Sequence, residues 1–380
     1  MAFMNARSPR TLALLFVTLL ALTACEAAPR ATSSSPTLSV PSEFLFAVTE
    51  SNPSPSQPNV VAIVGMDGIA RAKATFSPRV GPIVPDAYVP LQSVAQVAGS
   101  SVYYIDGAGT VRVLQAGSQP QIVARFPQQA AQEDNWFAVS PDGSRVLAGI
   151  FTFPALGPVI PNTSWNSMVG PSKFDLEAAP AGAKTTVLIH WSTDVRYPEG
   201  ASGPLFPVGW TAAGPLVMAG APLASQNAWP GGPLYVIDAA GQKTTLVGGA
   251  GCTSASMTTS RFIPCISGQV VTVRDQNGTV IWTTHVDAFS AASLFVSPDG
   301  QAISDGNRVE RRVGGMVALP VRASGPPSEF RTEGWLDTHT VIGRIVIDDV
   351  TEGDLAWIDI NHPTVMHDLG FKGDFVETLG

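Results

Sequence analysis

The chain has 380 residues, and its composition of 45% hydrophobic and 14% charged residues argues against a disordered protein. The net charge is −8 without a basic stripe, so nucleic acid is not expected as a partner, because such binding needs clustered lysines and arginines. Glycine and proline number 36 and 32, well above average usage, which favours a fold with many turns.

Residues 1–24 have the layout of a secretory signal peptide. Arg7 and Arg10 precede an uncharged, mostly apolar run that is too short to span a bilayer comfortably. The run ends in Leu22-Thr23-Ala24-Cys25, which resembles the lipobox of bacterial lipoproteins. This resemblance implies cleavage before Cys25 and a diacylglyceryl group on its sulfur, with acyl chains such as palmitate that hold the protein at a membrane. An ordinary signal peptide with a chance cysteine is the alternative.

Residues 25–41 are expected to form the lipidated cysteine and a flexible tether, because Ala, Ser, Thr and Pro dominate this stretch without apolar periodicity. From residue 42 to residue 380 the patterns are those of strands, with no convincing helical period. We therefore expect one all-β domain over 42–380, anchored by lipid to the cell membrane on its extracytoplasmic side.

Two stretches repeat one strand-turn pattern, at 135–143 and 293–300. In each, a short apolar strand runs into Ser-Pro-Asp-Gly, in which Pro presets φ and Asp and Gly suit the remaining turn positions. Other strand groups recur at steps of about forty residues, which is typical of propeller blades. The sequence therefore predicts a β-propeller, whose blades have four strands that we name A (inner) to D (outer).

Counting the turns between strands A and B predicts seven blades, with six or eight as alternatives. The N-terminal unit has only three strands, near 44–48, 60–64 and 70–76, whereas the last apolar run, 375–380, stands alone. We expect this C-terminal run to supply strand A of the N-terminal blade, which closes the ring without a free edge. The predicted A-to-B turns lie near Gly99, Gly143, Gly214, Ser260, Gly300 and His339.

Four long connections are expected between strands B and C, at 51–58, 154–183, 222–233 and 348–353. Of these, 154–183 is interpreted as an insertion that precedes a strand at 186–191. Trp165 and Trp229 fall in two of these loops and are candidate ligand contacts, because exposed aromatic rings recognise sugars and peptides. Packing of either ring on the blade below is the alternative.

A disulfide bond between Cys252 and Cys265 is predicted. If Thr258 and Thr259 form a two-residue hairpin turn, the two cysteines face each other directly on neighbouring strands, close enough to be bridged. Export places the protein where such bonds persist. A redox or metal pair is the weaker alternative, because no histidine lies nearby.

No catalytic motif is found. The chain lacks a Gly-x-Ser-x-Gly elbow, a His-Glu-x-x-His pair and a phosphate loop. His362 and His367 lie five residues apart, but a pair alone does not make a zinc site, so they are interpreted as solvated turn residues. We therefore assign no catalytic residue, no metal ligand and no cofactor.

The Ser-Pro-Asp-Gly stretches and their spacing resemble the WD-repeat-like propellers of the TolB type, which occur in bacterial envelopes. The resemblance implies a fold and carries no chemistry. The favoured hypothesis is a lipid-anchored, extracytoplasmic binding or scaffold module for a protein, peptide or glycan. The alternative is an extracytoplasmic hydrolase or lyase with its site at the propeller pore.

Overall fold

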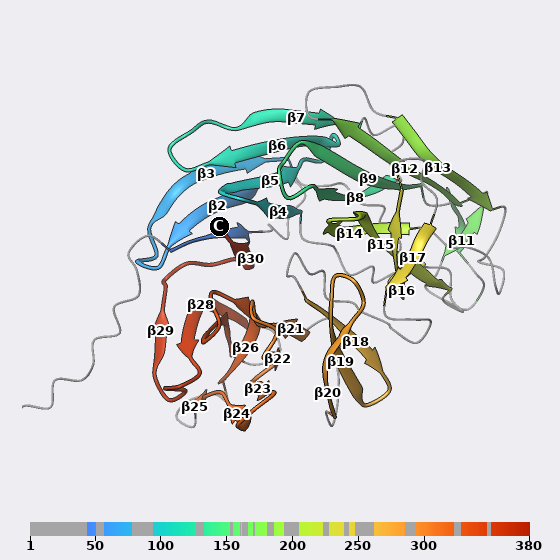
Figure 1. Ribbon diagram of the computed structural model, residues 1–380. Coiled ribbons are helices and arrows are strands. Elements are labelled where there is room, and N and C mark those ends of the chain that lie inside the picture. The colour runs from blue at the N-terminus through green and yellow to red at the C-terminus, as the bar shows by residue number, and fades with distance from the viewer. Residues whose placement is uncertain are drawn as a thin grey trace, which may run out of the picture. The chain divides into compact units, whose positions relative to one another are not determined.

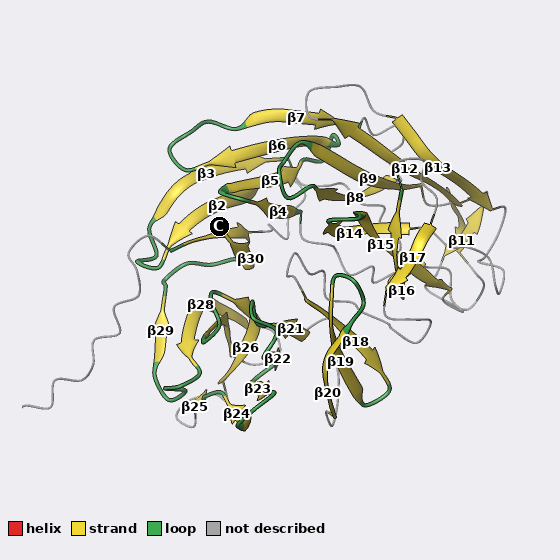
Figure 2. Cartoon of the chain, viewed as in Figure 1, coloured by secondary structure: helices red, strands yellow, loops and turns green. Residues whose placement is uncertain are grey.

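The computed structural model describes residues 44–50, 57–77, 94–126, 133–152, 155–159, 161, 166–169, 172–180, 186–193, 205–222, 228–238, 243–247, 262–285, 294–322, 328–347 and 351–380. The predictions for the signal peptide, Cys25, the tether, Trp165 and Cys252 lie outside these residues. The regular elements within the described ranges are all strands, joined by turns and loops (Figure 2).

Blades 1 to 3 are each a four-stranded antiparallel sheet (Figure 1), in which strand A is the first strand named and strand D the last. Blade 1 consists of β30 (Asp374–Thr378), β1 (Leu45–Glu50), β2 (Asn59–Gly65) and β3 (Ala70–Phe76). Blade 2 consists of β4 (Ala95–Ala98), β5 (Ser101–Ile105), β6 (Thr110–Gln115) and β7 (Gln121–Arg125). Blade 3 consists of β8 (Glu133–Val139), β9 (Arg145–Thr152), β12 (Ser172–Pro180) and β13 (Thr186–Thr193), with a hairpin of β10 (Ala155–Val159) and β11 (Asn166–Val169) between β9 and β12.

Blades 4 to 7 follow the same order. Blade 4 consists of β14 (Leu205–Thr211), β15 (Gly214–Pro222), β16 (Ala228–Ile237) and β17 (Lys243–Val247). The described strands of blade 5, β18 (Phe262–Ser267), β19 (Val270–Asp275) and β20 (Val280–His285), are its strands B, C and D. Blade 6 consists of β21 (Leu294–Val296), β22 (Ala302–Asp305), β23 (Arg308–Arg311) and β24 (Gly315–Ala318). Blade 7 consists of β26 (Ser328–Trp335), β27 (Thr340–Ile347), β28 (Thr351–Asp359) and β29 (Met366–Asp368), and the short β25 (Val321–Arg322) pairs with β26.

These sheets form a seven-bladed β-propeller, which confirms the predicted blade number. Both faces of a blade pack on neighbouring blades, so a strand such as β2 is buried at all seven positions. Each pair of neighbouring blades shares buried apolar side chains. In ring order from the contact of blades 1 and 2, examples are Val61 with Tyr104, Ile105 with Phe137, Trp136 with Phe206, Met218 with Ile263, Val271 with Leu294, Val309 with Phe330, and Trp357 with Phe46.

The ring closes through β30, as the sequence predicts. Figure 1 shows the red C-terminal strand beside the blue strands of the N-terminus. β30 pairs antiparallel with β1, matching Phe46 with Thr378 and Val48 with Phe375, and Leu379 N donates to Leu45 O at 2.9 Å. Both chain ends of the described part are thereby held in one sheet.

The two Ser-Pro-Asp-Gly turns have the same geometry. In the first, Ser140 Oγ donates to Asp142 Oδ1 at 2.6 Å and accepts from Arg145 N at 2.9 Å. The second repeats both bonds with Ser297, Asp299 and Ala302 at 2.7 and 2.9 Å. The turn glycines have φ of 70° and 71°, so the recurring motif is a local solution of turn chemistry.

Polar side chains also connect neighbouring blades. The Gln96 amide of blade 2 donates to Phe137 O at 2.8 Å and accepts from Val139 N at 3.1 Å in blade 3. Trp282 Nε1 of blade 5 donates to Gly300 O at 2.7 Å, and Trp335 Nε1 of blade 7 donates to Phe295 O at 3.0 Å in blade 6. These bonds satisfy backbone groups at the blade interfaces.

Two sequence-based interpretations of long loops are wrong. Residues 172–180, assigned to an insertion, form β12, which pairs with β9 from Lys173↔Thr152 to Pro180↔Arg145 and is strand C of blade 3. Its Lys, Asp and Glu alternate with buried positions such as Leu176. The strand was not predicted because these charged residues have low strand propensity. The backbone of Trp229 lies in β16 opposite Ala221, within a hairpin longer than predicted.

Candidate functional site

A cavity of about 730 Å³ lies on the propeller face that carries the A-to-B and C-to-D turns, which we call the turn face. Three consecutive blades supply its described lining. Blade 3 contributes Ser140, Pro141, Asp142 and Arg145, blade 4 contributes Trp210, Thr211 and Ala212, and blade 5 contributes Phe262, Asp275, Gln276 and Asn277.

The Ser-Pro-Asp-Gly turn of blade 3 forms one wall. The Asp142 carboxylate accepts from Ser140 Oγ, from Ser144 N at 3.0 Å and from Ser144 Oγ at 2.8 Å. The Ser140 hydroxyl, followed by the Ser144 N–H, lowers the pKa of Asp142 to about 2. Because hydrogen bonds to the charged form favour ionisation, Asp142 presents a fixed negative charge at the cavity.

Arg145 and Trp210 form a stacked pair between blades 3 and 4. The Arg145 Cζ lies 4.9 Å from the centre of the Trp210 ring. Each residue sits at the A-to-B turn of its blade, where β9 begins and β14 ends. Among the described residues, no acceptor takes a hydrogen bond from the Arg145 guanidinium, so its N–H donors remain available to a ligand. The Trp210 ring below keeps the guanidinium in place through a cation–π contact.

The C-to-D turn of blade 5 forms the facing wall. Asp275 Oδ1 accepts from Asn277 N at 2.9 Å and from Thr279 N at 2.8 Å, which fixes the turn that carries Gln276 and Asn277. Phe262, at the start of β18, packs against Gly300 of the next blade. The wall therefore combines two primary amides with a held aromatic ring.

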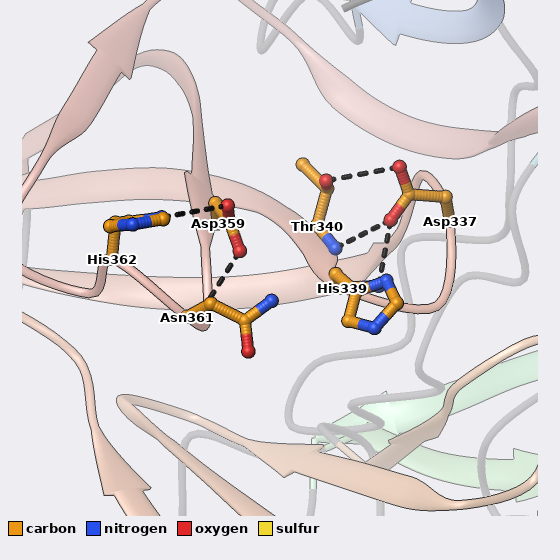
Figure 3. A network of polar contacts seen from close by, with 6 residues as sticks. All are labelled: Asp337, His339, Thr340, Asp359, Asn361 and His362. Atoms are coloured by element: carbon orange, nitrogen blue, oxygen red, sulfur yellow. Dashed lines mark hydrogen bonds and ion pairs between the residues drawn. The ribbon is translucent and has the colours of Figure 1, made fainter. Parts of the chain in front are cut away.

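A second polar network lies on the turn face of blade 7 (Figure 3). Asp337 Oδ1 accepts from His339 N and Thr340 N, both at 2.7 Å, which caps the A-to-B turn. In the C-to-D turn, Asp359 Oδ1 accepts from Asn361 N at 2.9 Å. Ile360 N donates to His339 O at 2.8 Å and joins the two turns.

Asp359 also holds a histidine in this network. Its Oδ2 lies 3.1 Å from His362 Nδ1, and the imidazole side chain is 53% exposed (Figure 3). Burial works to raise the pKa of Asp359, but the hydrogen bonds from Asn361 N and His362 outweigh it and leave the pKa below its usual value. A carboxylate that orients an exposed imidazole is the arrangement that general acid–base catalysis uses.

The two histidines singled out in the sequence do not meet in one site. His362 bonds Asp359 in the turn, as expected for a turn residue, whereas His367 lies in β29 and stacks on Trp357 with ring centres 3.8 Å apart. Within the described part of the chain, no group of three or more His, Cys, Asp or Glu side chains is placed to hold a metal ion.

An ion cluster joins blade 7 to the closing strand. Arg344 of β27 donates to Glu333 of β26, and it also donates to Asp374 Oδ1 of β30 at 2.5 Å. Glu333 Oε2 accepts from Phe375 N at 2.7 Å. Burial raises the pKa of Glu333 to about 7 against the opposing effect of Arg344. This cluster fixes β30 and does not contribute to the cavity lining.

The sequence-predicted site residues do not line the cavity as far as the structure describes them. Cys265 is buried in β18 within the cluster shared by blades 4 and 5, and its predicted bond to Cys252 stays a prediction. Trp229 has its backbone in β16, and Trp165 lies outside the described residues. Sequence reasoning missed Arg145 and Trp210, although both flank predicted A-to-B turns, because long loops were taken as the sign of a binding face.

The described residues thus define a seven-bladed β-propeller with a cavity on its turn face. No family model matches the chain, and no curated protein matches it. Two solved structures similar to it are oligogalacturonate lyases. One is described as a complex with manganese, with 9% identity, a TM-score of 0.39, and coverage of 82% of this chain and 95% of that one. The other comes from Vibrio parahaemolyticus, with 9% identity, a TM-score of 0.42, and coverage of 85% and 97%.

The described part of the chain contains no helix that is long and apolar enough to cross a membrane.

Proposed function

We propose that the protein is a lipid-anchored, extracytoplasmic binding module that takes part of a protein, peptide or glycan in the turn-face cavity of blades 3 to 5. The observation that carries this proposal is the Arg145–Trp210 pair, an aromatic plane and a set of uncommitted donors at the wall of a 730 Å³ cavity. Ligand sites combine apolar surface with a few polar groups in this way, in cavities of this size.

The carboxylates of the cavity support binding more than proton transfer. Asp142 and Asp275 both accept hydrogen bonds from the backbone of their own turns, so they hold the walls in shape. A rigid, preorganised wall lowers the entropic cost of association. The cavity is thus built as a recognition surface.

The anchor rests on the sequence Leu22-Thr23-Ala24-Cys25. We propose a membrane-bound, extracytoplasmic location, with a tether that reaches roughly 50 Å when extended. The first described strand, β1, begins at its A-to-B end, on the turn face.

The binding test uses the mature chain with Cys25→Ser, which keeps it soluble, as bait for solubilised envelope and for peptide and glycan arrays. Capture should fall with Trp210→Ala and with Arg145→Gln. The control is Arg331→Gln, which removes an exposed guanidinium paired to Glu329 on blade 7. Capture that is indifferent to both cavity variants would overturn the proposed binding site.

A second candidate function is a hydrolase or lyase whose base is His362. The observation that favours it is the exposed imidazole held by the Asp359 carboxylate. On this hypothesis His362→Gln abolishes turnover of a bound ligand while the binding affinity of the cavity stays unchanged. If the cavity variants lose affinity and the wild type shows no measurable turnover, the protein is a binding module alone.

A further inference from the structure

We infer that the ligand of the cavity is a neutral glycan. This inference rests on the proposed binding function and names the chemical class that the lining fits. It depends on three features of the described lining. These are its mixture of hydrogen-bond donors and acceptors, the sign of its net charge, and the hydrogen bonds that its backbone N–H groups already make.

Planar polar side chains of both hydrogen-bonding kinds line the cavity. Asp142 and Asp275 are acceptors, Arg145 is a donor, and the Gln276 and Asn277 amides are both. A sugar hydroxyl both donates and accepts hydrogen bonds at one oxygen. Neighbouring hydroxyls of a sugar can therefore bond to the donors and to the acceptors of this lining. The apolar face of a sugar ring is matched by Trp210 and Phe262, which lie in the same cavity.

The charge of the lining disfavours an anionic ligand. Two carboxylates face one guanidinium among the described lining residues, and the whole chain has a net charge of −8. The pKa of Asp142 is lowered to about 2, so its charge persists across the working pH range. A polyuronate would meet net repulsion from the two carboxylates of the lining, most strongly at low salt. A neutral chain of sugars meets none.

The backbone of the lining disfavours an extended peptide. Peptides that add to a sheet need a free strand edge with unpaired N–H and C=O groups. In the turns that form two walls of this cavity, Ser144 N and Asn277 N donate to aspartates and Gly143 N donates to Ser140 O at 2.7 Å, so these N–H groups are not open to a peptide. Recognition therefore falls to side chains, which suits a ligand rich in hydroxyl groups.

The experiment is calorimetric titration of the mature Cys25→Ser chain with neutral hexasaccharides of glucose, xylose and N-acetylglucosamine. Hexagalacturonate of the same length is the charged comparison, and an uncharged peptide library is the third arm. We expect one or more neutral glycans to bind, with affinity at least tenfold above that of hexagalacturonate at low salt. Trp210→Ala and Arg145→Gln should each weaken it about tenfold or more, and Gln276→Ala by less, whereas Arg331→Gln should leave it unchanged.

Arg145→Gln and Gln276→Ala change lining side chains that no described apolar cluster includes, so they keep the test valid if Trp210→Ala fails to fold. Tighter binding of hexagalacturonate than of every neutral glycan would overturn the inference. Peptide binding that is weakened by the cavity variants, without glycan binding, would also overturn it but leave the proposed function standing. If no arm shows binding that depends on the cavity residues, the inference fails, and the proposed function fails with it only if envelope capture is also indifferent to the cavity variants.

Discussion

At the scale of single residues, the repeated turn shows how backbone and packing demand the same amino acid. Gly143 has a φ of 70°, a conformation that costs a residue with a side chain about 1–2 kcal/mol. A Cβ at this position would also overlap the Tyr103 hydroxyl of blade 2. Gly117, with a φ of 72°, has no atom near the place where its Cβ would lie.

Gly143→Ala should therefore destabilise the protein by about 2–4 kcal/mol, the sum of a backbone cost and an overpacking cost. Gly117→Ala should cost only about 1 kcal/mol. Urea unfolding of the two variants measures the difference. Equal losses of stability would contradict the role given to Tyr103.

A pH dependence follows from Glu333, whose side chain is 15% exposed and sits between Arg344 and the closing strand. Its pKa rises to about 7 in the folded state from an ordinary value of 4.5. Between these values the folded state binds more protons than the unfolded chain, so the free energy of unfolding decreases as the pH rises through this window. The decrease levels off once the pH has passed through the folded pKa of about 7.

The wild type should accordingly be more stable near pH 5 than near pH 7.5, by up to about 3 kcal/mol for this one group. Glu333→Gln removes the titrating group and should flatten the curve over this window. The comparison of the two curves, by urea unfolding at each pH, isolates Glu333 from the other carboxyls. Parallel curves would show that its folded pKa is not raised.

At the scale of elements, the fit of β30 against blade 7 depends on a residue without a side chain. A Cβ at Gly334 of β26 would overlap the ring of Phe375 of β30. Phe375 packs in turn against Phe46, with ring centres 6.1 Å apart. The bulge between Thr332 and Gly334 in the pairing of β26 with β27 accompanies this close approach.

Gly334→Ala should destabilise the protein by about 1–3 kcal/mol, because the ring of Phe375 must move. Phe375→Leu alone loses packing. Combined with Gly334→Ala in a double variant, the smaller leucine leaves the space that the added methyl group needs. The double variant should thus lose less stability than the sum of the two single losses, by about 0.5 kcal/mol or more. Strict additivity in thermal or urea unfolding would argue against the contact.

The features of the propeller that could be predicted from the sequence are those that a few neighbouring residues determine. Ser140 to Gly143 and Ser297 to Gly300 specify their turns within four residues, so these two A-to-B turns were predicted correctly. The closing role of 375–380 was also predicted correctly, because an apolar run stood unmatched at one end of the repeat pattern and a three-stranded unit at the other. β12 was missed because Lys173 and its polar neighbours have no strong strand preference of their own. They form a strand only through pairing with β9, which is distant in the sequence. The cavity was missed because Arg145, Trp210 and Asp275 each look like ordinary turn residues, and only the ring brings them together.

At the scale of the whole molecule, stability depends on a closed ring in which the two ends of the chain share one blade. β30 covers the edge of β1 and contributes Phe375 to the cluster of blades 1 and 7. Gly380 N also donates to Gly99 O of blade 2 at 3.1 Å. The last few residues therefore contact three blades at once.

Deletion of residues 373–380 should lower the melting temperature strongly and promote association, because β1 then exposes an unpaired edge beside an opened apolar cluster. A matched control rearranges the same residues. Since Thr378 pairs with Phe46 and Leu379 N bonds Leu45 O, a chain in which 371–380 precede residue 44 through a short turn forms β30 and β1 as a hairpin. This permuted chain should be monomeric and melt close to the wild type. A deletion variant that melts like the full chain, or a permuted chain as unstable as the deletion variant, would show that closure by β30 does not hold the ring together.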